Sequence, residues 1–151
     1  MKGQGKIIRR MGYLRDQEGI MNRYLRETSN WDSHLSNTRK FILDSFRDPS
    51  LKTIAVLGSG WLLDVPLEEL CDRFERVFLV DINHPVQIRK KVGSLKKVEL
   101  IDADLSGGAM VQLWEMVRKK TRLQGKELLN QLELHPPLEQ LKPDALISVN
   151  L

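Results

Sequence analysis

The sequence predicts a doubly wound α/β fold behind an N-terminal helical segment, and two patterns support this prediction. Residues 53–57 and 77–80 are short apolar runs without alternation, which is typical of strands buried on both faces of a parallel sheet. Stretches with helical spacing or helix-capping residues lie between such runs. Strands that alternate with helices form β-α-β units with right-handed crossovers. We therefore expect a helical segment over residues 1–50 and an α/β domain over residues 51–151.

The N-terminal segment carries two helical patterns. Residues 1–15 are basic and interrupted by glycine, so we expect them to be loose or ordered only by packing. Residues 20–25 and 31–46 carry apolar side chains at helical spacing. The second stripe includes Ile42 and must be buried, so we expect these helices to pack on the α/β domain.

The remaining elements follow from the same reasoning. The expected strands are residues 53–57, 77–80, 98–101 and 144–149, and the expected helices are residues 64–74, 85–93 and 106–134, the last broken near Gly125. The chain stops at Leu151, in or just after an apolar run. An uncovered apolar edge is avoided in natural sheets, so we expect strands to be missing and this edge to self-associate.

Composition limits the class of protein. The chain has 151 residues and is 41% apolar and 29% charged, which suits one folded domain rather than a disordered polymer. No apolar run approaches the length of a bilayer span, and the basic N-terminus lacks the apolar region of a secretory signal. A single cysteine, Cys71, excludes an internal disulfide, and we expect it to serve packing in a cytoplasmic protein.

Charge is unevenly distributed along the chain. Residues 1–50 carry ten Lys or Arg and six Asp or Glu, whereas residues 51–151 carry fourteen of each. A basic segment can face nucleic acid, but a surplus this small favours a solvated helical surface. Three histidines without metal-ligand spacing predict no metal site.

Polar residues follow three of the expected strands. Gly58-Ser59-Gly60 comes after the first, and glycines there let the backbone turn sharply and approach a ligand. Asp81 ends the second strand, where a carboxylate can accept hydrogen bonds from ribose hydroxyls. Asp102 and Asp104 follow the third and can accept from the amine of adenine. Because ligands bind at the carboxyl ends of parallel strands, these residues predict an adenosine-type ligand.

The helix after the glycine turn discriminates between two such ligands. A dinucleotide fingerprint requires glycine at position 63, where the chain has Leu63. Asp64, Glu68 and Glu69 at the helix start would repel a pyrophosphate. S-adenosylmethionine has no phosphate and carries an ammonium and a sulfonium, so the sequence favours this methyl donor over NAD.

These segments resemble the class I S-adenosylmethionine-dependent methyltransferases, which have a Rossmann-like fold. The resemblance rests on residues 54–60, Val80-Asp81, residues 102–104 and residues 143–150, and covers about residues 51–151. It implies that Gly58, Ser59 and Gly60 line the methionine and ribose of the donor. It also implies that Asp81 holds the ribose hydroxyls, that Asp104 or, less favoured, Asp102 contacts the adenine amine, and that Ser148-Val149-Asn150 lies beside the transferred methyl group.

The chain departs from the family pattern at two positions. Val56 stands where the family often has an acidic residue, and Leu62 stands where it has a third glycine. The resemblance implies a methyltransferase, or its donor-binding portion, with direct displacement of the methyl group and an unidentified acceptor. The alternatives are an NAD(P)-dependent oxidoreductase and a non-catalytic Rossmann-like interaction domain.

The sequence leaves two alternative roles for each of Trp31, His34 and Trp61. Trp31 and His34 either close over the substrate pocket or belong to the packed helix surface. Trp61, directly after the glycine turn, either shields a ligand or packs against the N-terminal helices. His84 is expected in a loop near the adenosine.

Overall fold

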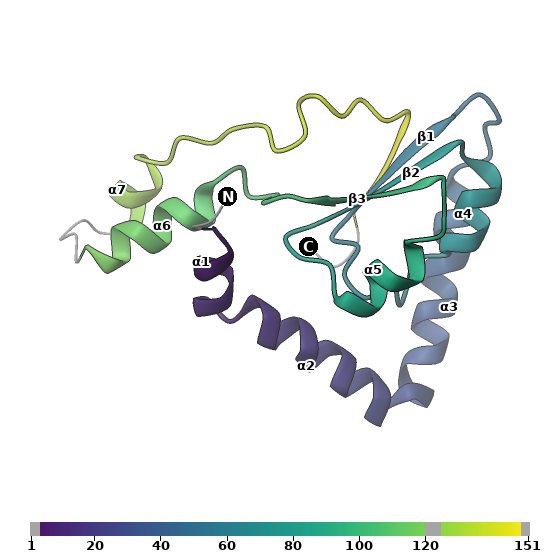
Figure 1. The fold of residues 1–151 in the computed structure, drawn as a ribbon, viewed down its shortest axis with the longest axis horizontal. Helices are drawn as coiled ribbons and strands as arrows, with labels where there is room; N and C mark the ends of the chain where they lie inside the picture. Colours follow the sequence, from purple (N-terminus) through teal and green to yellow (C-terminus); the bar gives the residue numbers. More distant parts are fainter. Residues whose placement is uncertain (1–3, 120–124, 149–151) are drawn as a thin grey trace.

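The computed structural model describes residues 4–119 and 125–148, and its centre is a four-stranded parallel sheet (Figure 1). The strands are β1 (Thr53–Leu57), β2 (Arg76–Asp81), β3 (Val98–Asp102) and β4 (Ala145–Ser148), in the order β3-β2-β1-β4. The chain therefore winds outward from β1 to β3 and then crosses back to place β4 on the other side of β1. A topological switch point lies between β1 and β4, which is where such sheets open a ligand crevice at their carboxyl edge.

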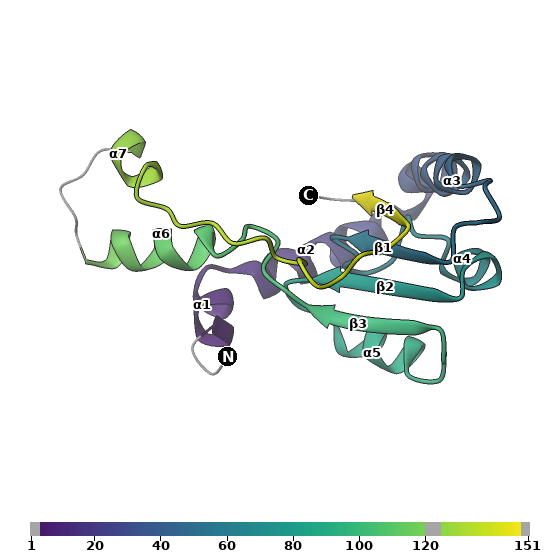
Figure 2. The same cartoon turned by 90° about the horizontal axis from the view of Figure 1, so that it is seen from above.

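Helices cover one face of the sheet and the crossover to β4 covers the other (Figures 1 and 2). The first face packs against α3 (Thr28–Ser45), α4 (Leu67–Arg73) and α5 (Val86–Val92). On the second face, Leu138 and Leu141 of the crossover pack against Ala55, Phe78 and Val80. The predicted α/β fold with a Rossmann-like doubly wound parallel sheet and an N-terminal helical segment is confirmed.

The core explains why β1 and β2 lack alternation. Ile54, Ala55 and Val56 are fully buried, and Val77 to Val80 are buried in the neighbouring strand. Both strands lie in the interior of the sheet, so each side chain has an apolar partner whichever face it points to. β3 and β4 lie at the two edges of the sheet among the described residues. Burial alternates along β4, whereas every residue of β3 is at least partly exposed.

The N-terminal residues are more regular than expected. Residues 4–10 form α1 (Gln4–Arg10), and α2 (Tyr13–Arg26) begins at Tyr13, so of the two alternatives expected for these residues the structure shows an ordered segment rather than a loose one. Gly12 separates the two helices with a φ of 87°, a left-handed conformation that glycine adopts without steric cost. The glycine that made the segment look irregular is therefore the residue that ends one helix and starts the next.

The helix α3 joins the core as predicted. Ile42 is 3% exposed and packs in the main apolar cluster with strand and helix residues of the α/β part. The Arg39 and Arg73 guanidinium groups donate to the carbonyls of Leu63 and Leu43, so polar contacts also join α3 to α4 and its preceding loop.

Several boundaries differ from the sequence expectation. α4 begins at Leu67 rather than near residue 64, because Leu62 has a φ of 57° and residues 63–66 remain a loop. The helical segment expected over residues 106–134 and broken near Gly125 contains α6 (Ala109–Arg118) and α7 (Gly125–Leu129) among its described residues, and both extend away from the sheet (Figure 2). It begins at Ala109 rather than Ser106 and ends at Leu129 rather than Leu134. β4 covers four of the six expected residues, and Val149 lies outside the described part of the chain.

Asp144 fixes the amino ends of β1 and β4 together. Its Oδ2 accepts hydrogen bonds from the backbone N–H groups of Lys52 and Thr53 at 2.8 Å and from the Thr53 hydroxyl at 2.9 Å.

Within residues 4–119 and 125–148, no helix combines the length and the hydrophobicity that a bilayer span requires.

Candidate functional site

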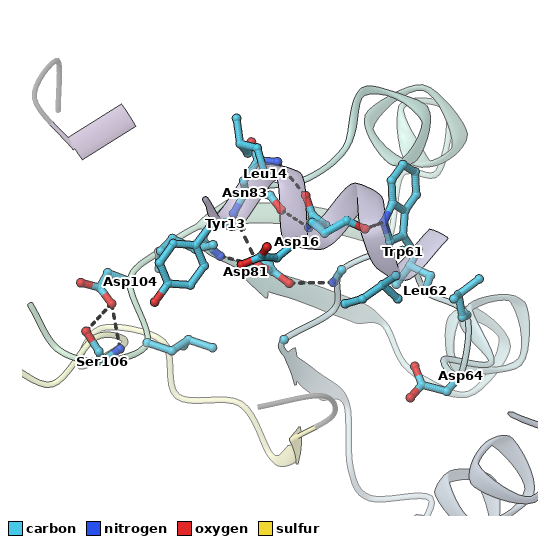
Figure 3. Close-up of a pocket in the computed structure, with 18 of the residues that line it drawn as sticks. Tyr13, Leu14, Asp16, Trp61, Leu62, Asp64, Asp81, Asn83, Asp104 and Ser106 are labelled. Carbon is cyan, nitrogen blue, oxygen red and sulfur yellow. Dashed lines mark hydrogen bonds between the residues drawn. The ribbon is translucent and has the colours of Figure 1, made fainter. Parts of the chain in front are cut away.

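A cavity of about 420 Å³ opens at the carboxyl ends of the strands, a size typical of small-molecule sites (Figure 3). One wall comes from the strand ends and the loops after them, and the other from α2 and α3. The strand-side wall includes Gly58, Gly60, Trp61, Leu62, Leu63, Asp64, Asp81, Ile82, Asn83, Ala103, Asp104, Leu105, Ser106 and, from α6, Met110. The helix-side wall consists of Tyr13, Leu14, Asp16, Gln17, Ile20, Trp31, His34 and Leu35.

The glycine turn after β1 forms the floor of this cavity. Gly58 and Gly60 have φ angles of 71° and 44°, a region that favours glycine. The backbone N–H groups of Gly58 and Ser59 both donate to the carbonyl of Val80, at 2.9 and 3.2 Å. The turn is thereby attached to the end of β2, next to Asp81.

Asp81 lies at the cavity wall in the place predicted for it. Its Oδ2 accepts the backbone N–H of Gly60 at 2.7 Å, and its Oδ1 accepts that of Ile82 at 2.7 Å. These bonds fix the carboxylate in one orientation. Oδ1 also accepts the Asn83 backbone N–H in a long contact of 3.5 Å, whereas Oδ2 has a further acceptor position for a hydroxyl donor from a ligand.

Asp104 lines the same cavity from the loop after β3. Its Oδ1 accepts from the backbone N–H and the hydroxyl of Ser106, at 2.9 and 2.6 Å. Its Oδ2 is buried and has no hydrogen-bond partner among the described residues. A buried carboxylate oxygen without a donor is uncommon in native proteins, so this atom has an unmet requirement for a hydrogen-bond donor.

Asp102 and Ser59 do not line this cavity. The Asp102 carboxylate contacts Arg89 Nη2 at 2.7 and 2.6 Å and His84 Nδ1 at 2.7 Å. Burial raises the pKa of Asp102, but the hydrogen bonds from Arg89 and His84 outweigh this effect and hold that pKa below its ordinary value. Of the two acids after β3, the structure brings only Asp104 to the cavity.

Ser59, in the middle of the glycine turn, and His84 are both buried. Ser59 Oγ lies 3.2 Å from His84 Nε2, so Ser59, His84 and Asp102 follow one another in the order of a hydrolytic triad. Ser59 is only 2% exposed, however, and a nucleophile must be reached by its substrate. This chain of contacts is therefore a buried structural network. His84 lies in a loop, as expected, and its side chain is fully buried.

A second group of contacts attaches α2 to the strand ends. The Gln17 side chain donates from Nε2 to the carbonyl of Asn83 and accepts at Oε1 from Asn83 Nδ2, each at 3.0 Å. Trp61 Nε1 donates to the Gln17 carbonyl at 2.7 Å. Trp61 thus contacts an N-terminal helix, as one of its two expected roles requires, and it also lines the cavity.

Of the other residues that the sequence singled out, some line the cavity and others lie elsewhere. Trp31 and His34 line the cavity, whereas Asn150 lies outside the described residues. Cys71 packs beside the main core, and burial raises the pKa of its thiol. No group of three His, Cys, Asp or Glu side chains suited to a metal ion occurs in the described ranges.

Sequence reasoning offered Trp31 and His34 for the helix-side wall but missed the part that α2 supplies. Gln17 and Asn83 are 66 residues apart, and nothing in either local sequence indicates that they meet. Asn83 itself offered a weak signal, because it stands two residues after Asp81 at a strand end.

The charge of the lining is one-sided. Asp16, Asp64, Asp81 and Asp104 line the cavity, and none of its described lining residues is Lys or Arg, although the chain carries a net charge of +4. An acidic wall concentrates cations and disfavours polyanionic ligands.

Comparisons with known proteins identify no family for this chain, so a function can be proposed only from the geometry of the cavity. No protein-family model, no curated protein and no solved structure matches the chain.

Proposed function

We propose that the cavity binds S-adenosylmethionine and that the protein is a methyltransferase, or the donor-binding portion of one. The observation that carries this proposal is the pair of acids Asp81 and Asp104, which face one cavity from the ends of adjacent strands. In a parallel sheet this is the edge where nucleotide-like ligands bind.

The two acids suit two different parts of an adenosine group. Asp81 is fixed by the backbone of Gly60 and Ile82, and its Oδ2 retains an acceptor position for a ribose hydroxyl. The free Oδ2 of Asp104 is suited to the exocyclic amine of adenine, which would satisfy a buried acceptor. The apolar side chains of Leu105 and Met110 beside it offer surface for a planar base.

The charge of the cavity favours the methyl donor over a dinucleotide. A pyrophosphate needs backbone N–H donors at a helix start or a basic side chain. Here the short helix α4 begins only at Leu67, and acids rather than bases line the wall. The sulfonium and ammonium of S-adenosylmethionine are compatible with such a wall, so an NAD(P)-dependent oxidoreductase is the weaker reading.

The departure at Leu62 does not oppose the proposal. Leu62 has a φ of 57°, so its backbone takes the left-handed conformation that the family's third glycine would favour. Its side chain is 6% exposed and packs in the main core. Burial of this side chain offsets a backbone strain of roughly 1–2 kcal/mol.

The residues of this chain would act by orientation. The donor would supply an electrophilic methyl group, and the acceptor would approach in line with its sulfonium carbon. Gly58, Gly60 and Asp81 would hold one partner of the reaction, and α2 with Gln17 would exclude water above it. Holding two reactants in line is sufficient for a large part of the rate enhancement in such a transfer.

Calorimetric titration tests the proposal directly. We expect S-adenosylhomocysteine to bind the full chain and NAD to bind at least tenfold more weakly. Preferential binding of NAD would replace the methyltransferase proposal with an oxidoreductase. Absence of binding by both would indicate a non-catalytic interaction domain that keeps the fold without the ligand.

A further inference from the structure

One buried hydrogen-bonded network joins three segments behind the cavity. Ser59 lies in the turn after β1, His84 in the loop between β2 and α5, and Asp102 at the end of β3. The contacts are 3.2 Å from Ser59 Oγ to His84 Nε2 and 2.7 Å from His84 Nδ1 to Asp102 Oδ1. The imidazole therefore bridges the ends of two strands that are not neighbours in the sheet.

The bonds define how the ring is oriented. The His84 side chain is fully buried, and Asp102 Oδ1 can only accept, so Nδ1 carries the proton of that bond. In the neutral ring, Nε2 then accepts a hydrogen bond from the Ser59 hydroxyl. A buried histidine with both nitrogens bonded is held in one tautomer and one rotamer.

Arg89 completes the outer end of the network. Its Nη2 contacts both Asp102 oxygens, and its Nε donates to the His84 carbonyl at 3.2 Å. The guanidinium neutralises Asp102 and supports the backbone of His84 at the same time. The network is thus anchored on α5, which packs its buried residues Ile88 and Val92 into the core.

The inner end of the network lies next to the cavity. Ser59 is followed by Gly60, whose N–H donates to Asp81 Oδ2 at 2.7 Å. Gly58 and Gly60 have left-handed φ angles and intrinsic freedom to take others, so the turn depends on its contacts for one conformation. The Ser59 hydroxyl supplies a side-chain contact in the middle of this turn.

We propose that His84 is a positioning residue that acts through Ser59 to hold the Gly60 N–H on Asp81, and so sets the orientation of the ligand-binding carboxylate. For the ligand, this inference rests on the function proposed above. Neither Ser59 nor His84 lines the cavity, so their effect on binding is indirect.

Two substitutions that each remove one hydroxyl group separate an effect on positioning from an effect on general stability. Ser59→Ala removes the hydroxyl that His84 holds. Thr53→Val removes a hydroxyl at the amino end of β1, which donates to Asp144 Oδ2 at 2.9 Å and accepts the Asp144 backbone N–H at 3.0 Å. Ser59→Ala loses one hydroxyl hydrogen bond and Thr53→Val loses two, but only Ser59 lies on the path to Asp81.

The first measurement is the affinity for S-adenosylhomocysteine in the full chain. We expect Ser59→Ala to weaken binding about three- to tenfold, as for the loss of one hydrogen bond, while Thr53→Val binds like the parent. Parent-like affinity of Ser59→Ala would overturn the proposal. An equal loss in both variants would also overturn it, because stability alone would then account for the effect.

The second measurement requires no ligand. The amide proton of Gly60 reports its hydrogen bond to Asp81 through its chemical shift and exchange rate, and we expect Ser59→Ala to shift it upfield and speed its exchange. Thr53→Val should leave it unchanged. If the parent fails to bind S-adenosylhomocysteine, the proposed function fails, and the Gly60 amide still decides the positioning role; an unchanged signal in Ser59→Ala would overturn it.

Discussion

The backbone N–H of Gly60 donates to Oδ2 of Asp81 across 2.7 Å, although the two residues are 21 positions apart. This bond joins the turn after β1 to the end of β2 and fixes the carboxylate at the wall of the cavity. It places the glycine turn and the acid, which the sequence singled out separately, in one hydrogen-bonded unit.

Replacement of Asp81 should weaken binding of the proposed donor more than replacement of Asp64. Asp81→Ala removes a charged acceptor opposite the expected ribose hydroxyls, a loss of about 1.5–3 kcal/mol. Asp64 lines the same cavity but lies beyond Leu62, well apart from Asp81 (Figure 3). Calorimetry with S-adenosylhomocysteine measures both variants, and parent-like affinity of Asp81→Ala would remove Asp81 from the site.

Replacement of Gln17 should loosen α2 from the strand ends. None of the α2 side chains is fully buried, so the contacts of Gln17 with Asn83 and Trp61 supply much of its attachment. Gln17→Ala removes two side-chain hydrogen bonds worth about 0.5–1.5 kcal/mol each. We expect faster hydrogen exchange across α2, whereas Glu18→Ala, an exposed neighbour, should exchange like the parent. Identical exchange in both variants would contradict this role.

Two adjacent residues of α3 should differ sharply in their effect on stability. Ile42 is 3% exposed in the main core, and Phe41 is 73% exposed on the same helix. We expect Ile42→Ala to lower the free energy of unfolding by about 2–5 kcal/mol and Phe41→Ala to change it by less than about 0.5 kcal/mol. Urea unfolding measures both, and similar small values would show that α3 does not share the core of the α/β part.

Asp144 should stabilise the fold in a pH-dependent manner. Backbone hydrogen bonds from Lys52 and Thr53 and the Thr53 hydroxyl lower the pKa of Asp144 below its ordinary value. A depressed pKa in the folded state contributes stability that is present above the unfolded pKa, about 4 for aspartate, and is lost as pH falls through the folded pKa.

The matching comparison is Asp144→Asn against the parent over a pH series. We expect the variant to be less stable at pH 7 and the difference to shrink as pH falls below about 4. Unfolding midpoints in urea at each pH provide the measurement. A difference that stays constant down to pH 2 would show that the carboxylate charge contributes nothing.

Local sequence was sufficient for the interior strands and the order of elements. β1 coincides with the predicted residues 53–57, because a short apolar run without alternation suits a strand that is buried on both faces of a parallel sheet. The packing of Ile42 and the place of Asp81 at a strand end also follow from local spacing. Self-association through the edge of β4 and the expected methyl donor stay predictions.

The sequence alone determined an α/β protein with a glycine turn and acids at successive strand ends. Consecutive residues are sufficient for this, because they give both the spacing of apolar side chains and the residues that end each strand. Only the tertiary structure decided which acid faces the cavity: Asp104 lines it, whereas Asp102 turns to Arg89 and His84. It also decided that Gln17 closes the site and that Ser59 is buried against His84. These choices depend on hydrogen bonds between residues that are distant in the chain, and the energy of such a bond leaves no pattern in the local sequence of either partner.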